Sequence, residues 1–328
     1  MILITGATGL VGSHLLLELL RNGKQVRALK RAGSSVSSVD KIFAHYNFPP
    51  PDKSLWVEGD VTDYFSLLDA MEGVEQVYHC AAMVSFAGSA EAQLMKVNAE
   101  GTANVVNAAM EKGVKKLCHV SSTAALGRAD NDKIITEETV WKISDKNSAY
   151  AVSKYAAERE VWRGTEEGLD AVIVNPCIII GPGDLTKSSG RMIQSVRNGL
   201  KFYTGGANAF VDARDVAKLM IALMESEIKN ERFILAAENL DYKNVFEMIA
   251  AALSKPAPTI RASSLLSALA WRAAFFAGLF SRSKPFITRE TAMTGQQRNV
   301  YSNKKLKEKL NWNFIPVKEA IENACKLS

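Results

Sequence analysis

The sequence of 328 residues predicts an α/β fold in which a doubly wound parallel sheet is followed by a smaller C-terminal region. Two observations predict it. Short apolar runs alternate with segments of helical periodicity through the first 175 residues, a pattern typical of parallel strands joined by helices. Beyond residue 176 the alternation becomes irregular. We therefore expect one domain over residues 1–175, a second region over 176–328, and a return of the chain to the first domain around 210–240.

The elements of the first domain follow from their apolar runs and the turn residues between them. "MILITG" is predicted as the first strand, and "GSHLLLELLRNG" as a helix ending at Gly23, because glycine tolerates the left-handed conformation of a helix end. Further strands are predicted at "QVRALK", "SLWVEGDVTD", "VEQVYHCAA" and "KKLCHVSS". Two long helices are predicted at "AQLMKVNAEGTANVVNAAMEKG", closed by Gly113, and at "AYAVSKYAAEREVWRG". "DAVIVNPCIIIGPGD" is predicted as a sixth strand that runs into a loop.

The second region has weaker patterns. Residues 184–209 are rich in Ser, Gly and Lys and are predicted as a loop and a helix. "AFVDARDVAKLMIALME" is predicted as a helix with an acidic start, and "RFILAAE" as a short strand. The tail "YSNKKLKEKLNWNFIPVKEAIENACK" is predicted as two short helices around a Trp–Pro turn.

The composition predicts a globular protein without a metal site. A hydrophobic content of 47% and a charged content of 23% are ordinary for such a chain, and a net charge of +5 indicates a solvated surface rather than a nucleic-acid partner. The four histidines are scattered, and no Cys/His cluster has metal-ligand spacing. The four cysteines lack paired spacing, which favours free thiols in a reducing compartment. Because "MILIT" leaves no room for a signal peptide, we expect a cytoplasmic protein.

One apolar segment, "SSLLSALAWRAAFFAGLF" (263–280), is long enough to approach a membrane span. Arg272 interrupts it near the middle, where a charge is costly in a bilayer. A buried or dimer-facing helix is therefore preferred, and a helix lying on a membrane surface stays an alternative.

The first strand leads into a glycine-rich turn, "TGATGLVGSHL", which predicts a dinucleotide site. Gly6 permits a tight turn, Gly9 lets the backbone approach a pyrophosphate, and Gly12 lets the helix pack closely on the strand. The N-terminus of the following helix offers free N–H groups and the positive end of its dipole to the phosphates. Strand, spacing and helix agree on a Rossmann-type dinucleotide-binding domain. Its remaining expected cofactor contacts are Thr8, Leu10 and Val11.

The end of the second strand favours NADP(H) over NAD(H). An NAD site usually places an acidic residue there for the ribose 2′-hydroxyl, whereas a 2′-phosphate needs a cation. In "ALKRAGSS", Lys30 stands at the position of the acid and Arg31 follows it. Arg31 can hold a phosphate with two hydrogen bonds, and Ser34 or Ser35 can add hydroxyl donors. NAD(H) stays an alternative, because both cations can simply be solvated.

"YAVSK" and "HVSSTAALG" predict a catalytic group. Tyr150 and Lys154 are four residues apart on one helical pattern, so they face the same side. A nearby ammonium, together with an oxidised nicotinamide, favours the phenolate and moves the phenol pKa toward neutrality. The hydroxyl of Ser122, at the carboxyl end of a strand, can hold a substrate oxygen, with Ser121 and Thr123 as alternative registers.

Together these motifs resemble the extended short-chain dehydrogenase/reductases, also called the NAD-dependent epimerase/dehydratase family. The matching pieces are "TGATGLVG", "GDVTD", "HCAA", "VNAEGTANVVNA", "VSSTAALG", "YAVSK", "GPGD" and "FVDARDVA", which span most of the chain in the family's order. The resemblance implies that Tyr150 is the general acid/base, that Lys154 activates it and binds the cofactor ribose, and that Ser122 holds the substrate oxygen. It implies further cofactor contacts at Asp60, Val61, Ala81, Ala82 and the stretch from Pro176 to Ile179.

The resemblance leaves two other polar residues with open roles. Asn98 stands where the family has an asparagine near the active site, but it can equally cap or brace its helix. Asp215 in "RDVA" is interpreted as a structural residue at a helix start.

Within the family, the chain looks more like the dihydroflavonol-reductase and 3β-hydroxysteroid-dehydrogenase branch than the nucleotide-sugar enzymes. The latter have an Arg and, three residues later, an Asn that reaches the sugar diphosphate, whereas this chain has Asn175 and Ile178. The leading hypothesis is an NADP-dependent reductase of a carbonyl or alcohol substrate, with residues 176–328 as a mostly substrate-binding region and an apolar substrate wall at 263–280. The alternatives are a nucleotide-sugar epimerase or dehydratase with bound NAD, and a non-catalytic NADP-binding regulatory module. The helices 91–112 and 150–163 are expected to form a homodimer interface.

Overall fold

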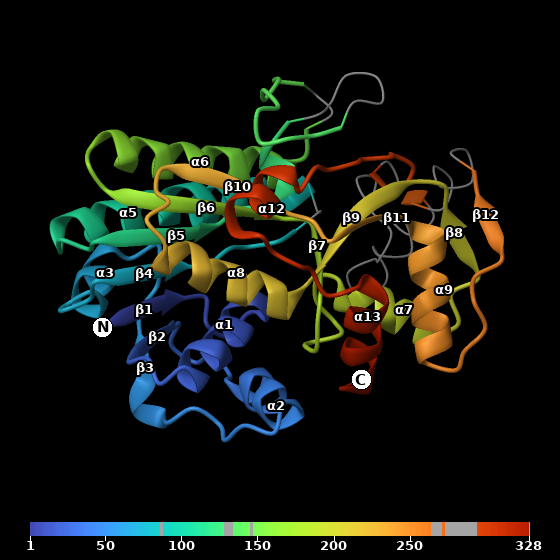
Figure 1. Cartoon of the computed structure of the whole chain (residues 1–328), viewed down its shortest axis with the longest axis horizontal. Helices are drawn as coiled ribbons and strands as arrows, with labels where there is room; N and C mark the ends of the chain where they lie inside the picture. The colour runs from blue at the N-terminus through green and yellow to red at the C-terminus, as the bar shows by residue number, and fades with distance from the viewer. Residues whose placement is uncertain (86–87, 128–133, 145–146, 264–270, 273–293, 328) are drawn as a thin grey trace.

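A central parallel sheet organises the computed structural model, which describes residues 1–85, 88–127, 134–144, 147–263, 271–272 and 294–327. In these residues the sheet has seven parallel strands in the order β3-β2-β1-β4-β5-β6-β10 (Figure 1). The strand order reverses between β1 and β4, and this confirms the prediction of a doubly wound, Rossmann-type fold. The strands are β1 (Ile2–Thr5), β2 (Val26–Lys30), β3 (Trp56–Glu58), β4 (Gln76–His79), β5 (Lys116–Val120), β6 (Asp170–Pro176) and β10 (Glu231–Leu235).

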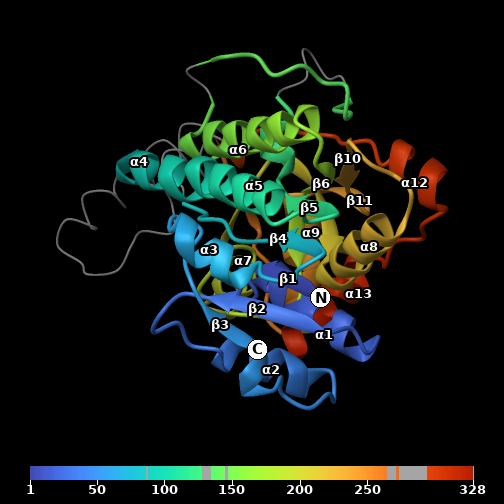
Figure 2. The same ribbon diagram turned by 90° about the vertical axis from the view of Figure 1, so that its left-hand side faces the viewer.

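Helices cover both faces of this sheet because alternate strand residues point to opposite sides. Ile4 belongs to the apolar core on one face, while its neighbour Leu3 belongs to the core on the other. Figure 2 shows α5 and α6 on one side of the sheet and α1 and α2 on the other. The first face is covered by α3 (Tyr64–Ala70), α5 (Gly101–Glu111) and α6 (Ala149–Glu166), and the second by α1 (Leu10–Arg21), α2 (Ser37–His45), α8 (Ala213–Glu225) and α12 (Lys304–Leu310).

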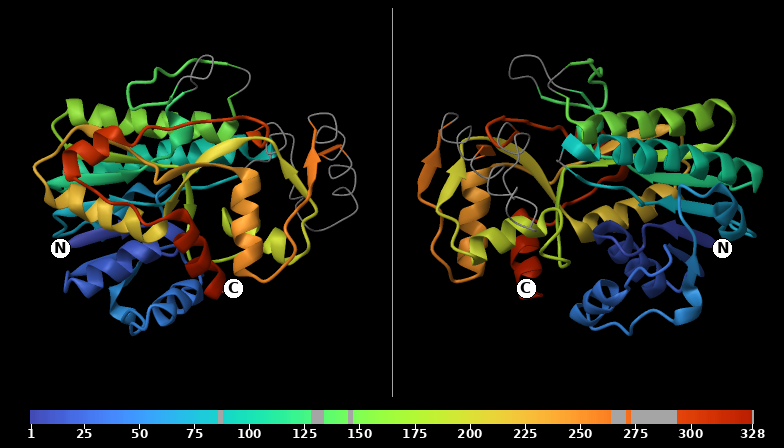
Figure 3. Two further views of the ribbon diagram at one scale, coloured as in Figure 1. Left: turned by 45° about the vertical axis from the view of Figure 1, so that its right-hand side comes forward. Right: turned by 180° about the vertical axis from the view of Figure 1, so that it is seen from behind.

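The C-terminal region has its own small sheets and lies beyond one edge of the central sheet (Figure 3). Strand β9 (Ala207–Asp212) pairs with β7 (Ile178–Ile180) and β11 (Glu238–Asp241), and β8 (Phe202–Thr204) pairs with β12 (Ile260–Ala262). A separate apolar core is formed between β7, β9, β11 and three helices: α7 (Gly190–Arg197), α9 (Tyr242–Ala252) and α13 (Val317–Lys326).

The chain crosses between the two parts more than once. Strand β10 comes after the first small strands and forms the edge of the central sheet beside β6. The division at residue 175 stays a prediction. Buried Asp215 in the first turn of α8 accepts hydrogen bonds from Trp312 Nε1 (3.2 Å) and from the Ile315 backbone N–H (2.8 Å). Its contacts are therefore structural, and they fix the turn between α12 and α13 against α8.

Four predicted segments differ from the structure. Residues 184–209, predicted as a loop and a helix, contain α7 but also strand β8 and the first residues of β9, because the chain pairs there with β12 and β11. The single strand predicted at "DAVIVNPCIIIGPGD" is two strands in different sheets, because the chain leaves the central sheet at Cys177. The helix predicted at "AFVDARDVAKLMIALME" begins as strand β9, and α8 starts only at Ala213, where the Asp212 side chain accepts a hydrogen bond from the Arg214 N–H. The long helix before Gly113 contains a π-helical stretch, Met95–Glu100, between α4 (Glu91–Leu94) and α5.

The cysteines and the long apolar segment were further sequence predictions. All four cysteines are free thiols, as their spacing predicts. The segment 263–280 lies mostly outside the described residues, so its interpretation stays a prediction. None of the helices that the structure describes combines the length and apolar character needed to cross a membrane.

Candidate active site and cofactor-binding loop

The candidate site residues gather at the carboxyl edge of the central sheet. The glycine-rich turn follows β1, Ala81 follows β4, Ser122 follows β5, and Pro176 ends β6. Parallel strands present their carboxyl ends on one edge, and ligands of such sheets bind where the strand order reverses. The sequence-predicted positions are thus brought together at the reversal between β1 and β4.

The three glycines of the first turn have different surroundings. Gly6 has a φ of +67°, and a Cβ on it would lie 2.5 Å from the Ala81 backbone nitrogen. A Cβ on Gly12 would collide with the Gly6 carbonyl oxygen. Gly9 is exposed, and a Cβ there would meet only the Gly6 oxygen, at 3.3 Å. Gly6 and Gly12 are therefore required by packing within the protein, whereas the space beside Gly9 is open.

Helix α1 begins directly after this open space. Its N-cap is Gly9, and no side chain caps the first turn. The N-terminal N–H groups of a helix have no acceptors within the helix itself, and they favour an anion. Thr8, Leu10 and Val11 are partly exposed around this helix end. The loop therefore fits a pyrophosphate, as its spacing predicts.

The cations at the end of β2 have different partners. Lys30 Nζ forms an ion pair with Glu58 Oε1 at 3.1 Å, from the neighbouring strand β3. The Arg31 side chain is exposed, and the described residues offer it no ion-pair partner. Lys30 is thus already neutralised, whereas Arg31 keeps its charge available to a ligand. This difference cannot be read from "KR" in the sequence.

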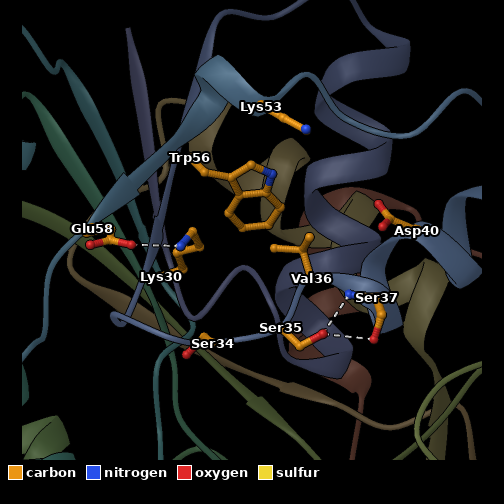
Figure 4. Close-up of a pocket in the computed structure, with 9 residues that line it drawn as sticks. All are labelled: Lys30, Ser34, Ser35, Val36, Ser37, Asp40, Lys53, Trp56 and Glu58. Atoms are coloured by element: carbon orange, nitrogen blue, oxygen red, sulfur yellow. Dashed lines mark hydrogen bonds and ion pairs between the residues drawn. The ribbon is translucent and has the colours of Figure 1, made fainter.

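Two hollows open beside these cations. One, of about 580 Å³, is lined by Lys30, Lys53 and Trp56 together with the serines that follow Arg31 (Figure 4). The other, of about 610 Å³, is lined by Arg31, Gly33, Ser34, Glu58, Gly59, Asp60, Asp63 and Ser66, among others. Both lie where the sequence predicts the adenosine end of a dinucleotide, and Ser34 borders both.

The remaining predicted cofactor contacts differ in exposure. The Asp60 carboxylate lines the second hollow, and its Oδ1 accepts hydrogen bonds from the Thr62 N–H and hydroxyl, both at 2.9 Å. Val61 is buried, as is Pro176. Ala82 is exposed, whereas Ala81 and Ile179 are half-buried. The role of each in binding a cofactor stays a prediction.

Ser122, Tyr150 and Lys154 form the candidate catalytic group. Helix α6 starts after Ser148, whose hydroxyl accepts a hydrogen bond from the Ala151 N–H, so Tyr150 and Lys154 lie in its first two turns. The Ser122 side chain hydrogen-bonds the Tyr150 phenol. Buried Lys154 donates from Nζ to the Val120 carbonyl oxygen at 2.8 Å, which places its ammonium at the end of β5. Of the three registers the sequence allows, the Ser122 hydroxyl hydrogen-bonds Tyr150, whereas the buried Ser121 hydroxyl has no hydrogen-bond partner among the described residues.

Burial dominates the electrostatics of this group. It raises the pKa of Tyr150 above its usual value, and the hydrogen bond with Ser122 acts in the opposite direction. It lowers the pKa of Lys154 to about 8, while the Glu158 carboxylate and the Cys80 thiol act upward. The sequence-based expectation that Lys154 lowers the phenol pKa is thus not met in the protein alone. It stays a prediction for the complex with an oxidised nicotinamide.

Asn98 braces the neighbouring segments. Its Nδ2 donates to the Met83 carbonyl oxygen (3.0 Å) and to Ser153 Oγ (2.9 Å), and its Oδ1 accepts from the Met83 N–H (2.7 Å). These bonds connect the π-helical stretch, the segment after β4 and helix α6. Of the open roles for Asn98, the structure therefore supports the brace.

Sequence reasoning missed a buried polar group beneath the candidate catalytic residues. Glu158 on α6 accepts a hydrogen bond from Asn175 Nδ2 and forms an ion pair with Arg232 Nη1 at 3.2 Å. The signal in the sequence was the position of Glu158, four residues after Lys154 on the same helical face. Asn175, compared above with a phosphate-binding position, is fully buried in this group instead.

Comparisons with known proteins identify the family of this chain. The model of the NAD dependent epimerase/dehydratase family matches residues 2–236. Sterol demethylase protein B of Methylococcus capsulatus is 32% identical over 79% of this chain and 76% of its own length, and a putative dihydroflavonol 4-reductase of Synechocystis is 31% identical over 78% and 73%. The crystal structure of gox2253 superposes with a TM-score of 0.80 and 30% identity over 100% of this chain and 97% of that one. The chain therefore belongs to the NAD-dependent epimerase/dehydratase family of NAD(P)-binding enzymes.

Proposed function

We propose that this enzyme transfers a hydride between NADP(H) and a carbonyl or alcohol substrate, with Tyr150 as its general acid/base. The observation that carries the proposal is the contact of the Ser122 hydroxyl with the Tyr150 phenol at the carboxyl edge of the sheet. Lys154 lies one helical turn away, and the open glycine loop lies on the same edge. This edge therefore holds a proton donor, a hydroxyl that can bind a substrate oxygen and a cation, beside a loop that fits a dinucleotide.

The chain's own residues supply the steps other than hydride transfer. The bound cofactor would deliver the hydride to the carbonyl carbon. The Tyr150 hydroxyl gives its proton to the carbonyl oxygen, which the Ser122 hydroxyl orients by a hydrogen bond. The phenolate that remains is stabilised by the Lys154 ammonium, and it regains a proton before the next turnover. The described residues occupy only one of the three N–H donors of Lys154, so the others fit ribose hydroxyls.

Arg31 is proposed to select NADP(H). Arg31→Ala is expected to weaken NADPH binding by about 10- to 100-fold and NADH binding by less than about 3-fold, because only NADPH loses a charge-assisted hydrogen bond to its phosphate. Fluorescence titration with each nucleotide measures both changes. Lys30→Ala is the control, because Glu58 already neutralises Lys30, and it should have the smaller effect on NADPH. Equal losses for the two nucleotides in Arg31→Ala would contradict the assignment.

The substrate is proposed to be an apolar molecule with a carbonyl or alcohol group. The names of the two relatives refer to a sterol and a dihydroflavonol, which are both largely apolar ring systems. The nucleotide-sugar alternative has less support, because the positions compared with its phosphate ligands hold buried Asn175 and apolar Ile178.

A single assay tests the proposed function against its alternatives. The purified protein is expected to oxidise NADPH in the presence of ketosteroid or dihydroflavonol probes, measured by absorbance at the NADPH band. A protein that is purified with tightly bound oxidised NAD, and that does not consume NADPH, would support the epimerase alternative. NADPH binding without oxidation across a panel of carbonyl compounds would support a regulatory module.

The chain is proposed to work as a homodimer in the cytoplasm. Helices α5 and α6 lie side by side on one face of the sheet, and paired with a second copy they would form a four-helix interface (Figure 2). Light scattering is expected to give twice the chain mass of 35.8 kDa, and a monomer at micromolar concentration would contradict this. Four free thiols support a reducing compartment, which cell fractionation can test.

A further inference from the structure

Helix α6 carries a third polar residue in line with the two candidate catalytic ones. Tyr150, Lys154 and Glu158 follow one another at intervals of four residues, so they lie along one face of the helix. Glu158 is only 1% exposed. A buried carboxylate is costly unless charged or hydrogen-bonded partners compensate it, so its partners indicate what it does.

One partner of Glu158 leads to the candidate catalytic serine. Asn175 Nδ2, at the end of β6, donates one hydrogen bond to Glu158 Oε1 and another to the Ser122 carbonyl oxygen, the latter at 3.0 Å. One amide thus connects the carboxylate to the backbone that carries the Ser122 hydroxyl. The same hydroxyl contacts Tyr150, so the connection returns to the helix where it began.

The other partner of Glu158 is held in place by a loop. Arg232 on β10 forms its ion pair with Glu158 Oε2 at 3.2 Å, and its Nε donates to the Glu137 carbonyl oxygen at 2.9 Å. The Glu137 carboxylate is itself occupied, because it accepts a hydrogen bond from the Ile234 N–H at 2.8 Å. Arg232 is therefore fixed from two sides, and it keeps the Glu158 carboxylate in one position.

The charge of Glu158 also acts on Lys154. The groups that face the Lys154 ammonium are Glu158 on α6, the Cys80 thiol after β4, and the histidines His79 and His119 on β4 and β5. Burial keeps both histidines neutral by lowering their pKa values, that of His79 to about 3, and it raises the pKa of Cys80. Glu158, which forms the ion pair with Arg232, is therefore the carboxylate among these groups.

We propose that Glu158 is a positioning residue of the catalytic group, whose one buried carboxylate holds the Ser122 backbone through Asn175 and stabilises the ammonium form of Lys154. This inference rests on the proposed roles of Ser122, Tyr150 and Lys154. Stability alone does not account for such a group, because apolar residues of similar volume often replace buried ion pairs without loss. The geometry instead gives Glu158 two roles that can be tested separately. Its charge acts on the Lys154 ammonium, and its contact with Asn175 positions the Ser122 backbone.

The charge can be tested without knowing the substrate. Protein labelled with ¹³C at lysine Cε is titrated by NMR, with Lys154→Met to assign the Lys154 signal. Glu158→Gln keeps an acceptor for Asn175 but removes the charge, and it is expected to move the Lys154 midpoint to lower pH by about 1 unit. Arg232→Gln removes the opposing charge and should move the midpoint upward or not at all. Glu160→Gln is the matched control, because Glu160 pairs with Arg163 at the helix surface and should leave the midpoint unchanged.

The contact of Glu158 with Asn175 is tested by measuring the turnover of variants. Asn175→Ala is expected to lower kcat about 10-fold, through displacement of Ser122, while leaving the Lys154 midpoint in place. Glu158→Asp keeps the charge but shortens the reach, so it should behave like Asn175→Ala. In Glu158→Gln, the alkaline limb of the kcat/KM profile should move to lower pH together with the NMR midpoint.

The outcomes separate this inference from the proposed function. An unchanged Lys154 midpoint in Glu158→Gln would overturn the role of the charge. If Glu158→Gln alone fails to fold, the double variant Glu158→Gln/Arg232→Gln is compared with Arg232→Gln, and equal Lys154 midpoints in these two would overturn it as well. Full activity of Asn175→Ala would overturn the role of the contact. If these variants behave as expected in the titration while Tyr150→Phe remains active, the proposed function is wrong and only the electrostatic link between Glu158 and Lys154 stands.

Discussion

Tyr150→Phe is expected to remove nearly all turnover while NADPH binding stays within about 2-fold of the parent protein. The substitution deletes only the hydroxyl that exchanges a proton with the substrate oxygen, and general acid/base catalysis contributes about 10²- to 10⁴-fold to a rate. The ring still fills its place at the start of α6. Steady-state oxidation of NADPH with an accepted carbonyl substrate measures the rate, and fluorescence titration measures binding.

Tyr155→Phe is the matched control for this result. Tyr155 lies on the same helix, and its ring stacks on Trp141 at 4.5 Å between centroids with an angle of 6° between the planes. Phenylalanine keeps that stacking, so this variant should retain activity. If Tyr150→Phe kept a rate within a few-fold of the parent, Tyr150 would not be the acid/base.

Lys154→Met is expected to be inactive and yet more stable than the parent near neutral pH. The pKa of Lys154 falls from an ordinary 10.5 to about 8 on folding, because burial disfavours the ammonium form. Each pKa unit corresponds to about 1.4 kcal/mol, so protonated Lys154 costs the folded state about 3 kcal/mol. Methionine has a similar shape and no charge, although it loses the hydrogen bond to the Val120 carbonyl. A net gain of about 2 kcal/mol in the free energy of unfolding is expected from urea denaturation without added nucleotide.

The pH dependence of this gain provides a further check. Below pH 8 both the folded and the unfolded chain carry the proton on Lys154, so the full cost is present. Between about pH 8 and 10.5 the unfolded chain binds the proton and the folded chain does not, so the parent gains stability as pH rises and the difference from Lys154→Met declines. Lys112→Met, on a partly exposed lysine paired with Glu72, should change little at any pH. A destabilised Lys154→Met at pH 7 would mean that the ammonium supports the fold.

The parts of the site that could be predicted from the sequence are those set by local spacing. The three glycines are three residues apart between a strand and a helix, and Tyr150 and Lys154 are one helical turn apart, so each set lies together whatever the rest of the chain does. The group of Glu158, Asn175 and Arg232 joins a helix and two strands, which only the tertiary fold brings together. The pairing of Lys30 with Glu58 depends likewise on the register between β2 and β3.

The errors in the fold have a common physical origin. "IVNPCIII" is apolar apart from Asn175, so its periodicity contains no sign that β6 ends at Pro176 and that β7 joins another sheet. In "AFVDARDVA" the helix signal of the later residues extended over the strand, although Asp212 is a good N-cap and marks the true boundary. Both errors come from reading two adjoining elements as one.

The attachment of the C-terminal turn to Asp215 has a consequence for exchanging parts between relatives. Helix α8, which covers one face of the central sheet, comes from beyond residue 212, and the residues that fix its first turn come from beyond residue 311. The nucleotide-binding half is therefore not a contiguous cassette. A chimera joined at residue 175 would leave the α1 side of the sheet covered by a foreign helix and anchored by a foreign tail. Grafts that change substrate preference in this scaffold need to follow the spatial layers instead of the order of the chain.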